Sequence, residues 1–201
     1  MKEQVLTLVL IRHATTNANE AGLYIGKSES PLSLKGREEA KRICKKLEEW
    51  QFDHIYISPS QRAKETIKSF AQQNQSVEVI EALQEIDFGM CEGKDFNWLL
   101  QHYPEEVVRM QEEGIGYQYP GGESLIMAHQ RVASWLNDFL KSHQSGTYLI
   151  VAHGGTIRCM VSELLVKNPS LHWHFKINPA TLTVIHVQQG FPVIDVLNEK
   201  C

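Results

Sequence analysis

The stretch Val5-Leu6-Thr7-Leu8-Val9-Leu10-Ile11-Arg12-His13 decides how the rest of the chain is interpreted. Its first seven residues are almost all aliphatic or β-branched, which is typical of a strand buried on both faces. A strand of this kind belongs to a parallel sheet that is covered by helices on both sides. The run then ends in two basic residues, Arg12 and His13. We therefore predict a buried strand whose carboxyl end carries chemically useful side chains.

Strands and helices alternate along most of the chain. Further strands are predicted at 54–57, 77–80 and 148–152, followed by a terminal hairpin of 182–187 and 192–196. Amphipathic helices are predicted over 34–50, after Ser58-Pro59, after Ser124 and from Gly154-Gly155 onward. This alternation indicates an α/β fold, a three-layer α/β/α sandwich whose sheet is mostly parallel with an antiparallel edge.

The segment from Phe88 to Gly122 does not follow this alternation. It holds a cluster of aromatic side chains, namely Trp98, Tyr103, Tyr117 and Tyr119. We predict a single domain over residues 1–201 with a cap insertion at about 88–122. We expect the cap to cover a ligand pocket and to contact the organic part of the ligand.

Composition limits the classes of partner. The net charge of −4 gives no general basic field for nucleic acid. No stretch reaches the roughly 18–20 apolar residues that span a bilayer, and the start Met1–Gln4 does not open a signal peptide. Four scattered cysteines without a Cys-x-x-Cys pair argue against disulfides and thiolate zinc. We expect a cytoplasmic protein that binds neither nucleic acid nor membrane; its oligomeric state is not encoded in any pattern.

Charged or titratable residues follow four of the predicted strands. These residues are Arg12 and His13, Arg62, Glu85, and His153. The carboxyl ends of parallel strands meet at one edge of a sheet, where ligands bind in folds of this kind. One or two such side chains could lie there by chance, but four strand ends indicate a site.

Arg12 and Arg62 at one edge form a receptor for a dianion. Guanidinium groups bind phosphate oxygens through paired hydrogen bonds and stay charged at physiological pH. Backbone N–H groups at Gly154-Gly155, at the start of a helix, add further donors. Neutralising the equatorial oxygens is most of what a protein must do in phosphoryl transfer. The ligand predicted from these residues is a small phosphorylated metabolite.

His13 is the predicted nucleophile. A neutral imidazole nitrogen attacks phosphorus without first losing a proton. The chain has no Cys-x5-Arg loop, and Ser58 has no obvious adjacent base. We expect His153 to donate a hydrogen bond to the transferring phosphoryl group.

A carboxylic acid can protonate the leaving oxygen and later accept a proton from water. Glu85, Asp87 and Glu92 all follow the third strand, and the chemistry by itself does not choose among them.

No metal or other cofactor is expected. Arg12 and Arg62 would repel a divalent cation from His13 and His153. The pair His172-x-His174 has a spacing that metals use, but no third ligand is evident near it.

Six blocks, in order along the chain, resemble the histidine phosphatase superfamily, in its phosphoglycerate-mutase-like branch. They are Leu10-Ile11-Arg12-His13-Ala14-Thr15-Thr16-x-x-Asn19, Gly26-x-x-x-x-Pro31-Leu32-Ser33-x-x-Gly36, Ser58-Pro59-x-x-Arg62-Ala63-x-x-Thr66, Leu83-x-Glu85-x-x-Phe88-Gly89-x-x-Glu92-Gly93, Gly121-Gly122-Glu123-Ser124 and Val151-Ala152-His153-Gly154-Gly155. Within the family, the sequence is most similar to the α-ribazole-phosphate phosphatases.

The resemblance implies a phosphomonoesterase that forms a phosphohistidine on His13, and it selects Glu85 as the proton donor. It also implies a phosphate pocket made of Arg12, Arg62 and His153 with nearby contributions from Asn19, Gly26, Ser28 and Gly154. Two residues depart from the family pattern, since Ala14 and Thr15 stand where the family has Gly and Glu. The second change removes a carboxylate beside the nucleophile.

Two other functions are consistent with these residues. A phosphoglycerate mutase would exclude water and return the phosphoryl group to its intermediate, although the mutases of this branch are longer chains. A non-catalytic module that binds a phosphorylated ligand is supported only by Ala14 and Thr15.

Overall fold

The computed structural model describes residues 5–73 and 76–201, so Met1–Gln4 lie outside it. Its sheet has six strands in the order β3-β2-β4-β1-β5-β6. Their bounds are β1 Val5–Arg12, β2 His54–Ile57, β3 Val77–Val79, β4 Gly146–Ala152, β5 Thr181–Gln188 and β6 Phe191–Lys200. The strands β1 to β4 pair in parallel, whereas β5 and β6 pair antiparallel at one side. The predicted mostly parallel sheet with an antiparallel edge is confirmed.

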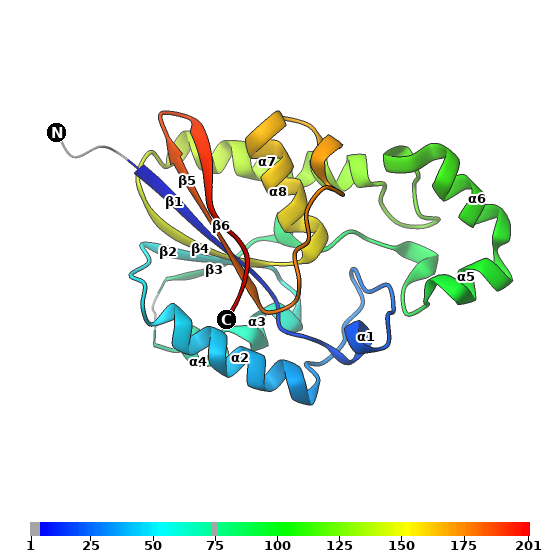
Figure 1. Cartoon of the computed structure of the whole chain (residues 1–201), viewed down its shortest axis with the longest axis horizontal. Coiled ribbons are helices and arrows are strands. Elements are labelled where there is room, and N and C mark those ends of the chain that lie inside the picture. The colour runs from blue at the N-terminus through cyan, green and yellow to red at the C-terminus, as the bar shows by residue number, and fades with distance from the viewer. Residues whose placement is uncertain (1–4, 74–75) are drawn as a thin grey trace.

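Helices cover both faces of this sheet (Figure 1). Their bounds are α1 Asn17–Glu20, α2 Leu34–Leu47, α3 Gln61–Thr66, α4 Lys68–Ala71, α5 Phe96–His102, α6 Pro104–Glu113, α7 Leu125–Ser142 and α8 Gly154–Val166. Residues Leu8 and Leu10 of β1 pack in one core with side chains of α7 and α8. Their neighbours Val9 and Ile11 pack in a second core with α2, α3 and Ile67. Alternate residues of one strand therefore fill two cores, which confirms the three-layer sandwich.

The helix predicted after Ser58-Pro59 differs from the sequence prediction in its start and in its continuity. The helix that was expected to begin at Ser58-Pro59 begins after Ser60, whose hydroxyl accepts the N–H of Ala63. It is interrupted at Ile67, where φ is −114° and ψ is 16°, so the segment forms two short helices. None of the helices in the described ranges has the length and apolar character needed to cross a membrane.

The segment Phe88 to Gly122 contains the helices α5 and α6, which the alternation pattern did not reveal. Asp95 caps α5 through its side chain, and Pro104 opens α6. The two helices project beyond the end of the sheet (Figure 1). They bury Leu99 and Val107 together with Cys91 in a small core of their own. Each helix buries a single residue, Leu99 in α5 and Val107 in α6.

Gly36 fixes how closely α2 approaches the loop that follows β1. A Cβ atom at this position would overlap the backbone carbonyl oxygen of Thr15. We expect Gly36→Ala to lower the free energy of unfolding by roughly 1–3 kcal/mol, the usual cost of overpacking. Helix propensity alone would favour alanine by about 1 kcal/mol, so the sign of the change in urea denaturation reports the clash.

Gly116→Ala is the matched control, because a Cβ atom there meets nothing within 4 Å. A Gly36→Ala variant that is more stable than the wild type by about 1 kcal/mol, the full gain in helix propensity, would show that α2 can move away from the loop at no cost.

Candidate active site

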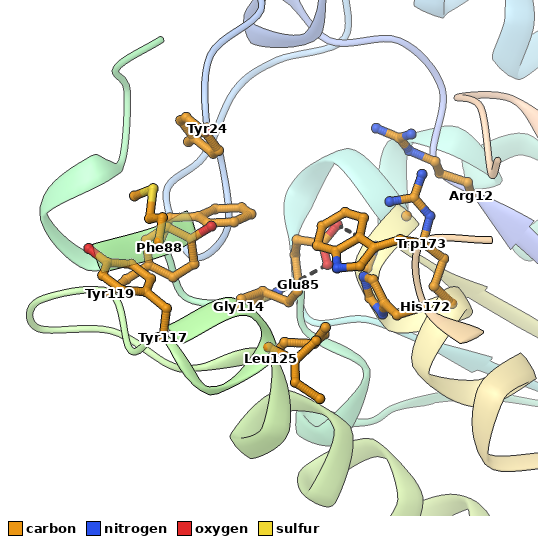
Figure 2. A pocket seen from close by; sticks show the side chains of 16 residues that line it. Arg12, Tyr24, Glu85, Phe88, Gly114, Tyr117, Tyr119, Leu125, His172 and Trp173 are labelled. Atoms are coloured by element: carbon orange, nitrogen blue, oxygen red, sulfur yellow. Dashed lines mark hydrogen bonds between the residues drawn. The ribbon is translucent and has the colours of Figure 1, made fainter. Parts of the chain in front are cut away.

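A cavity of about 560 Å³ lies at the carboxyl ends of β1 and β4 (Figure 2). Its polar side is formed by Arg12, Glu85, Gly154 and Gly155. The opposite side carries aromatic rings from the chain before and within the segment 88–122, namely Tyr24, Phe88, Tyr117 and Tyr119 (Figure 2). The cavity is thus charged at one end and aromatic at the other.

His13 follows β1 directly and is 3% exposed. Its Nδ1 lies 2.8 Å from the carbonyl oxygen of Ala14. A carbonyl oxygen only accepts, so Nδ1 carries the proton and the Nε2 lone pair remains free in the neutral ring. Burial, and then the charges of Arg12 and Arg62, hold the pKa of His13 well below its usual value. The side chain is therefore a neutral imidazole with an available nitrogen at neutral pH.

The two arginines flank His13 and are anchored by backbone carbonyls. Arg12 donates from Nη1 to Ile177 O at 2.6 Å, while its buried Nε has no partner in the described part of the chain. Burial lowers the pKa of Arg12 to about 10, so the group stays charged at neutral pH. Arg62 is 1% exposed and donates to the carbonyl oxygens of Gly26 and Ser28 at 2.6 and 2.8 Å. Two of its five N–H donors are used in this way.

The loop 26–28 is held from two sides. Its carbonyl oxygens face Arg62, and its N–H groups donate to the carboxylate of Glu92 at 2.9–3.3 Å. Gly26 and Ser28 therefore do not line the cavity, and their N–H groups are not free for a ligand. Asn19 does not line it either, because its side chain completes a capping box with Thr16 at the start of α1.

His153 lies beside His13, with the two ring centres 5.1 Å apart, and it is fully buried. Its Nε2 is 2.7 Å from the hydroxyl of Ser58, and its Nδ1 has no partner among the described residues. The expectation that Ser58 has no adjacent base is wrong. The two residues are 95 positions apart in the chain, and only the pairing of β2 with β4 brings them together.

Glu85 is the carboxyl group at the cavity. Its oxygens accept the backbone N–H groups of Ile86, Gly155 and Thr156 at 3.0–3.2 Å. A Cβ atom on Gly155 would overlap the Glu85 carboxylate, so only glycine permits this contact. The two competing acids are engaged elsewhere: Asp87 pairs with Lys27 at 2.8 Å and Glu92 holds the loop 26–28.

The loop that carries the two unusual residues is held by side chains from α2 and α3. Ala14 N donates to Thr66 Oγ1 at 2.9 Å. Thr15 N donates to the buried carboxylate of Glu39 at 2.8 Å. A carboxylate from α2 therefore contacts the loop at the position where the family pattern has its own glutamate.

The lining also includes residues that sequence reasoning did not place there, among them Arg158, His172 and Trp173. Arg158 could have been predicted from its position one helical turn after Gly154, because residues three or four apart lie on the same face of a helix. His172 is buried with Nδ1 3.7 Å from Cys159 Sγ, whereas His174 is exposed, so the two histidines do not converge. Within residues 5–73 and 76–201, no three His, Cys, Asp or Glu side chains are grouped as metal ligands.

Comparison with known proteins agrees with this fold. Residues 8–200 match the histidine phosphatase superfamily (branch 1). The chain belongs to this family. It is 34% identical to phosphoserine phosphatase 1 of Hydrogenobacter thermophilus, over 98% of this chain and 94% of that protein. It is also 34% identical to a 2,3-bisphosphoglycerate-dependent phosphoglycerate mutase of Bartonella henselae, over 79% of this chain and 81% of the mutase.

The likeness extends to the three-dimensional structure. The crystal structure of the α-ribazole phosphatase from Shigella flexneri superposes with a TM-score of 0.88 at 28% identity, over 96% of both chains. The resemblance seen in the six sequence blocks is thus confirmed for the family and the fold.

The buried histidines make the stability depend on pH. Burial lowers the pKa of His172 from 6.5 to about 3. Between these values the unfolded chain binds a proton that the folded protein does not, so stability falls as the pH falls through this window. We expect His172→Asn to reduce the slope of unfolding free energy against pH by up to about 1.4 kcal/mol per pH unit. Urea titrations at pH 7, 6 and 5 measure it.

His174→Asn, at the exposed neighbour, is the matched control. If the His172→Asn variant kept the wild-type slope, the depressed pKa of His172 would be refuted.

Proposed function

We propose that this protein is a metal-independent phosphomonoesterase that transfers the phosphoryl group of a small metabolite to His13. The observation that carries the proposal is the hydrogen bond from His13 Nδ1 to Ala14 O. It leaves a neutral Nε2 lone pair next to the positive charges of Arg12 and Arg62. An uncharged nucleophile between fixed cations suits attack on a dianionic ester.

In this proposal the phosphate oxygens are bound by Arg12, by the unused N–H groups of Arg62 and by the backbone at Gly154, the first residue of α8. His153 donates from Nδ1, because Ser58 can supply the hydrogen bond that Nε2 accepts. Gly26 and Ser28 act through Arg62, whose guanidinium their carbonyl oxygens orient.

Asn19 does not contact the phosphate in this proposal. It stabilises the start of α1, the helix that follows the loop carrying His13.

The first chemical step forms a bond between His13 Nε2 and phosphorus while the bond from phosphorus to the alcohol oxygen breaks. Glu85 in its acid form gives its proton to that oxygen. In the second step water attacks phosphorus, its proton passes to the Glu85 carboxylate, and the bond to Nε2 breaks. Phosphate and neutral His13 are regenerated.

The substrate is proposed to be a small metabolite whose organic part contacts the aromatic side of the cavity. The names of the relatives suggest two kinds of ester: α-ribazole 5′-phosphate with its heterocycle, and phosphoserine with its carboxylate. The sequence blocks resemble those of the α-ribazole-phosphate phosphatases, whereas Arg158 in the cavity offers a cation for the carboxylate of the second. The cytoplasm is the proposed compartment, since all four cysteines, which lie in the described chain, are unpaired.

Phosphoglycerate mutase activity is the second candidate, because mutases are among the relatives. Release of inorganic phosphate in the presence of a chelator supports the hydrolase, and isomerisation of phosphoglycerate without release supports the mutase. Binding of phosphate analogues without turnover of any ester would indicate a non-catalytic module.

We expect His13→Ala to abolish turnover without loss of the fold, because His13 Nε2 is the nitrogen that attacks phosphorus in this proposal. Rapid quenching of the wild type with a 32P-labelled ester should trap acid-labile label on the protein, and the variant should trap none. His102→Ala, at an exposed histidine of α5, is the matched control. Appreciable activity in His13→Ala would refute covalent catalysis.

We expect Glu85→Gln to slow alkyl phosphates about 10²–10⁴-fold, the usual contribution of a general acid. Aryl phosphates with good leaving groups should lose far less, because their leaving oxygen needs no proton. The ratio of kcat values on p-nitrophenyl phosphate and an alkyl phosphate measures the difference. Exposed Glu81→Gln is the control, and an equal loss on both esters would assign the acid to another residue.

A further inference from the structure

Arg158 faces the cavity from α8, on the same side of the helix as Gly154 and Gly155. Residues three and four apart lie on one helical face, so a ligand that meets the two glycines also meets Arg158. Arg158 and Arg12 both line the cavity. The two guanidinium groups are close enough that the positive charge of Arg158 lowers the pKa of Arg12.

The guanidinium of Arg158 forms no ion pair within the part of the chain that the structure describes. Its Nε is buried without a hydrogen-bond partner, and no ion pair joins it to the described residues. Glu85 is the acid that acts on it electrostatically, but the Glu85 oxygens are already engaged by three backbone N–H groups. A partly buried cation without a partner is costly. This cost is recovered when a ligand supplies the anion.

Trp173 holds the guanidinium from one side. The Arg158 Cζ lies 5.5 Å from the centre of the indole ring, within the range of a cation–π contact. The ring of His172 packs against this indole at 4.6 Å and is itself buried. Trp173 is nonetheless 70% exposed and extends over the cavity (Figure 2). An indole that covers one face of the guanidinium leaves its N–H edge for a ligand.

We propose that Arg158, held by Trp173, forms a second anion subsite that binds a carboxylate on the organic part of the substrate. The inference rests on the proposed function and narrows its substrate class to phosphorylated carboxylic acids, such as phosphorylated amino or hydroxy acids. One guanidinium edge matches one carboxylate through two parallel hydrogen bonds. A second phosphate dianion would need a second cation, and Arg12 and Arg62 already serve the first. An ester without a further charge would leave Arg158 unpaired.

Two substrates that differ in one group test this subsite. 3-Phosphoglycerate carries a carboxylate where glycerol 3-phosphate carries a hydroxymethyl group. We expect the wild type to hydrolyse the first with the higher kcat/KM. Arg158→Met should lower the ratio of the two kcat/KM values about tenfold to a hundredfold, as expected for a hydrogen bond to a charged group. Arg158→Lys, which keeps the charge but not the planar edge, should retain part of the ratio.

Arg37→Met, at an exposed arginine of α2, is the matched control and should leave the ratio unchanged. An equal loss of kcat/KM on both esters in Arg158→Met would overturn the proposal, since Arg158 would then serve the phosphoryl group. A wild type that prefers α-ribazole 5′-phosphate to every carboxylate ester would overturn it as well.

Binding measurements separate this proposal from the proposed reaction. In the His13→Ala background, calorimetry gives the Kd of 3-phosphoglycerate and of glycerol 3-phosphate without turnover. Tighter binding of 3-phosphoglycerate that disappears with Arg158→Met supports the subsite even if the wild type hydrolyses neither ester. Equal Kd values for the two ligands overturn it even if the wild type is an active phosphatase.

Discussion

The parallel pairing of β1 with β4 is the constraint on which the rest of the structure depends. Its register sets Arg12 opposite Ala152, and the N–H of His13 donates to the carbonyl oxygen of Ala152 at 3.0 Å. The two strands therefore end side by side, and the residues that follow them, His13 and His153, meet with ring centres 5.1 Å apart. Because α8 begins at the next residue, Gly154, its N–H groups open toward the same point.

Burial and positive charge act together at this point. Arg12 and Arg62 disfavour a second positive charge nearby, and both histidines are enclosed, so their pKa values fall well below normal. Both rings are then neutral, and hydrogen bonds decide which nitrogen carries the proton. The same enclosure is costly for the arginines, which explains why carbonyl oxygens of Gly26, Ser28 and Ile177 surround them.

Much of the sheet could be predicted from the sequence because its strands are continuous apolar runs that end in polar residues. The convergence of Arg12, His13 and His153 followed from the rule that parallel strands share a carboxyl edge. The helices α5 and α6 escaped prediction because no strand separates them and the segment breaks the alternation of strands and helices. The contact between Ser58 and His153 escaped it because strand order, which no local pattern encodes, places β2 beside β4.

The sequence by itself determined the alternating layers, the family and the residue types available at the sheet edge, since these depend on local periodicity and on order along the chain. The family resemblance had already selected Glu85 among the three acids. Only the tertiary structure decided which nitrogen of His13 is free and that Arg158 faces the cavity without an ion pair to the described residues. Those properties depend on distances of about 3 Å between segments far apart in the chain, the range at which hydrogen bonds and ion pairs form. No pattern within a single segment contains such distances.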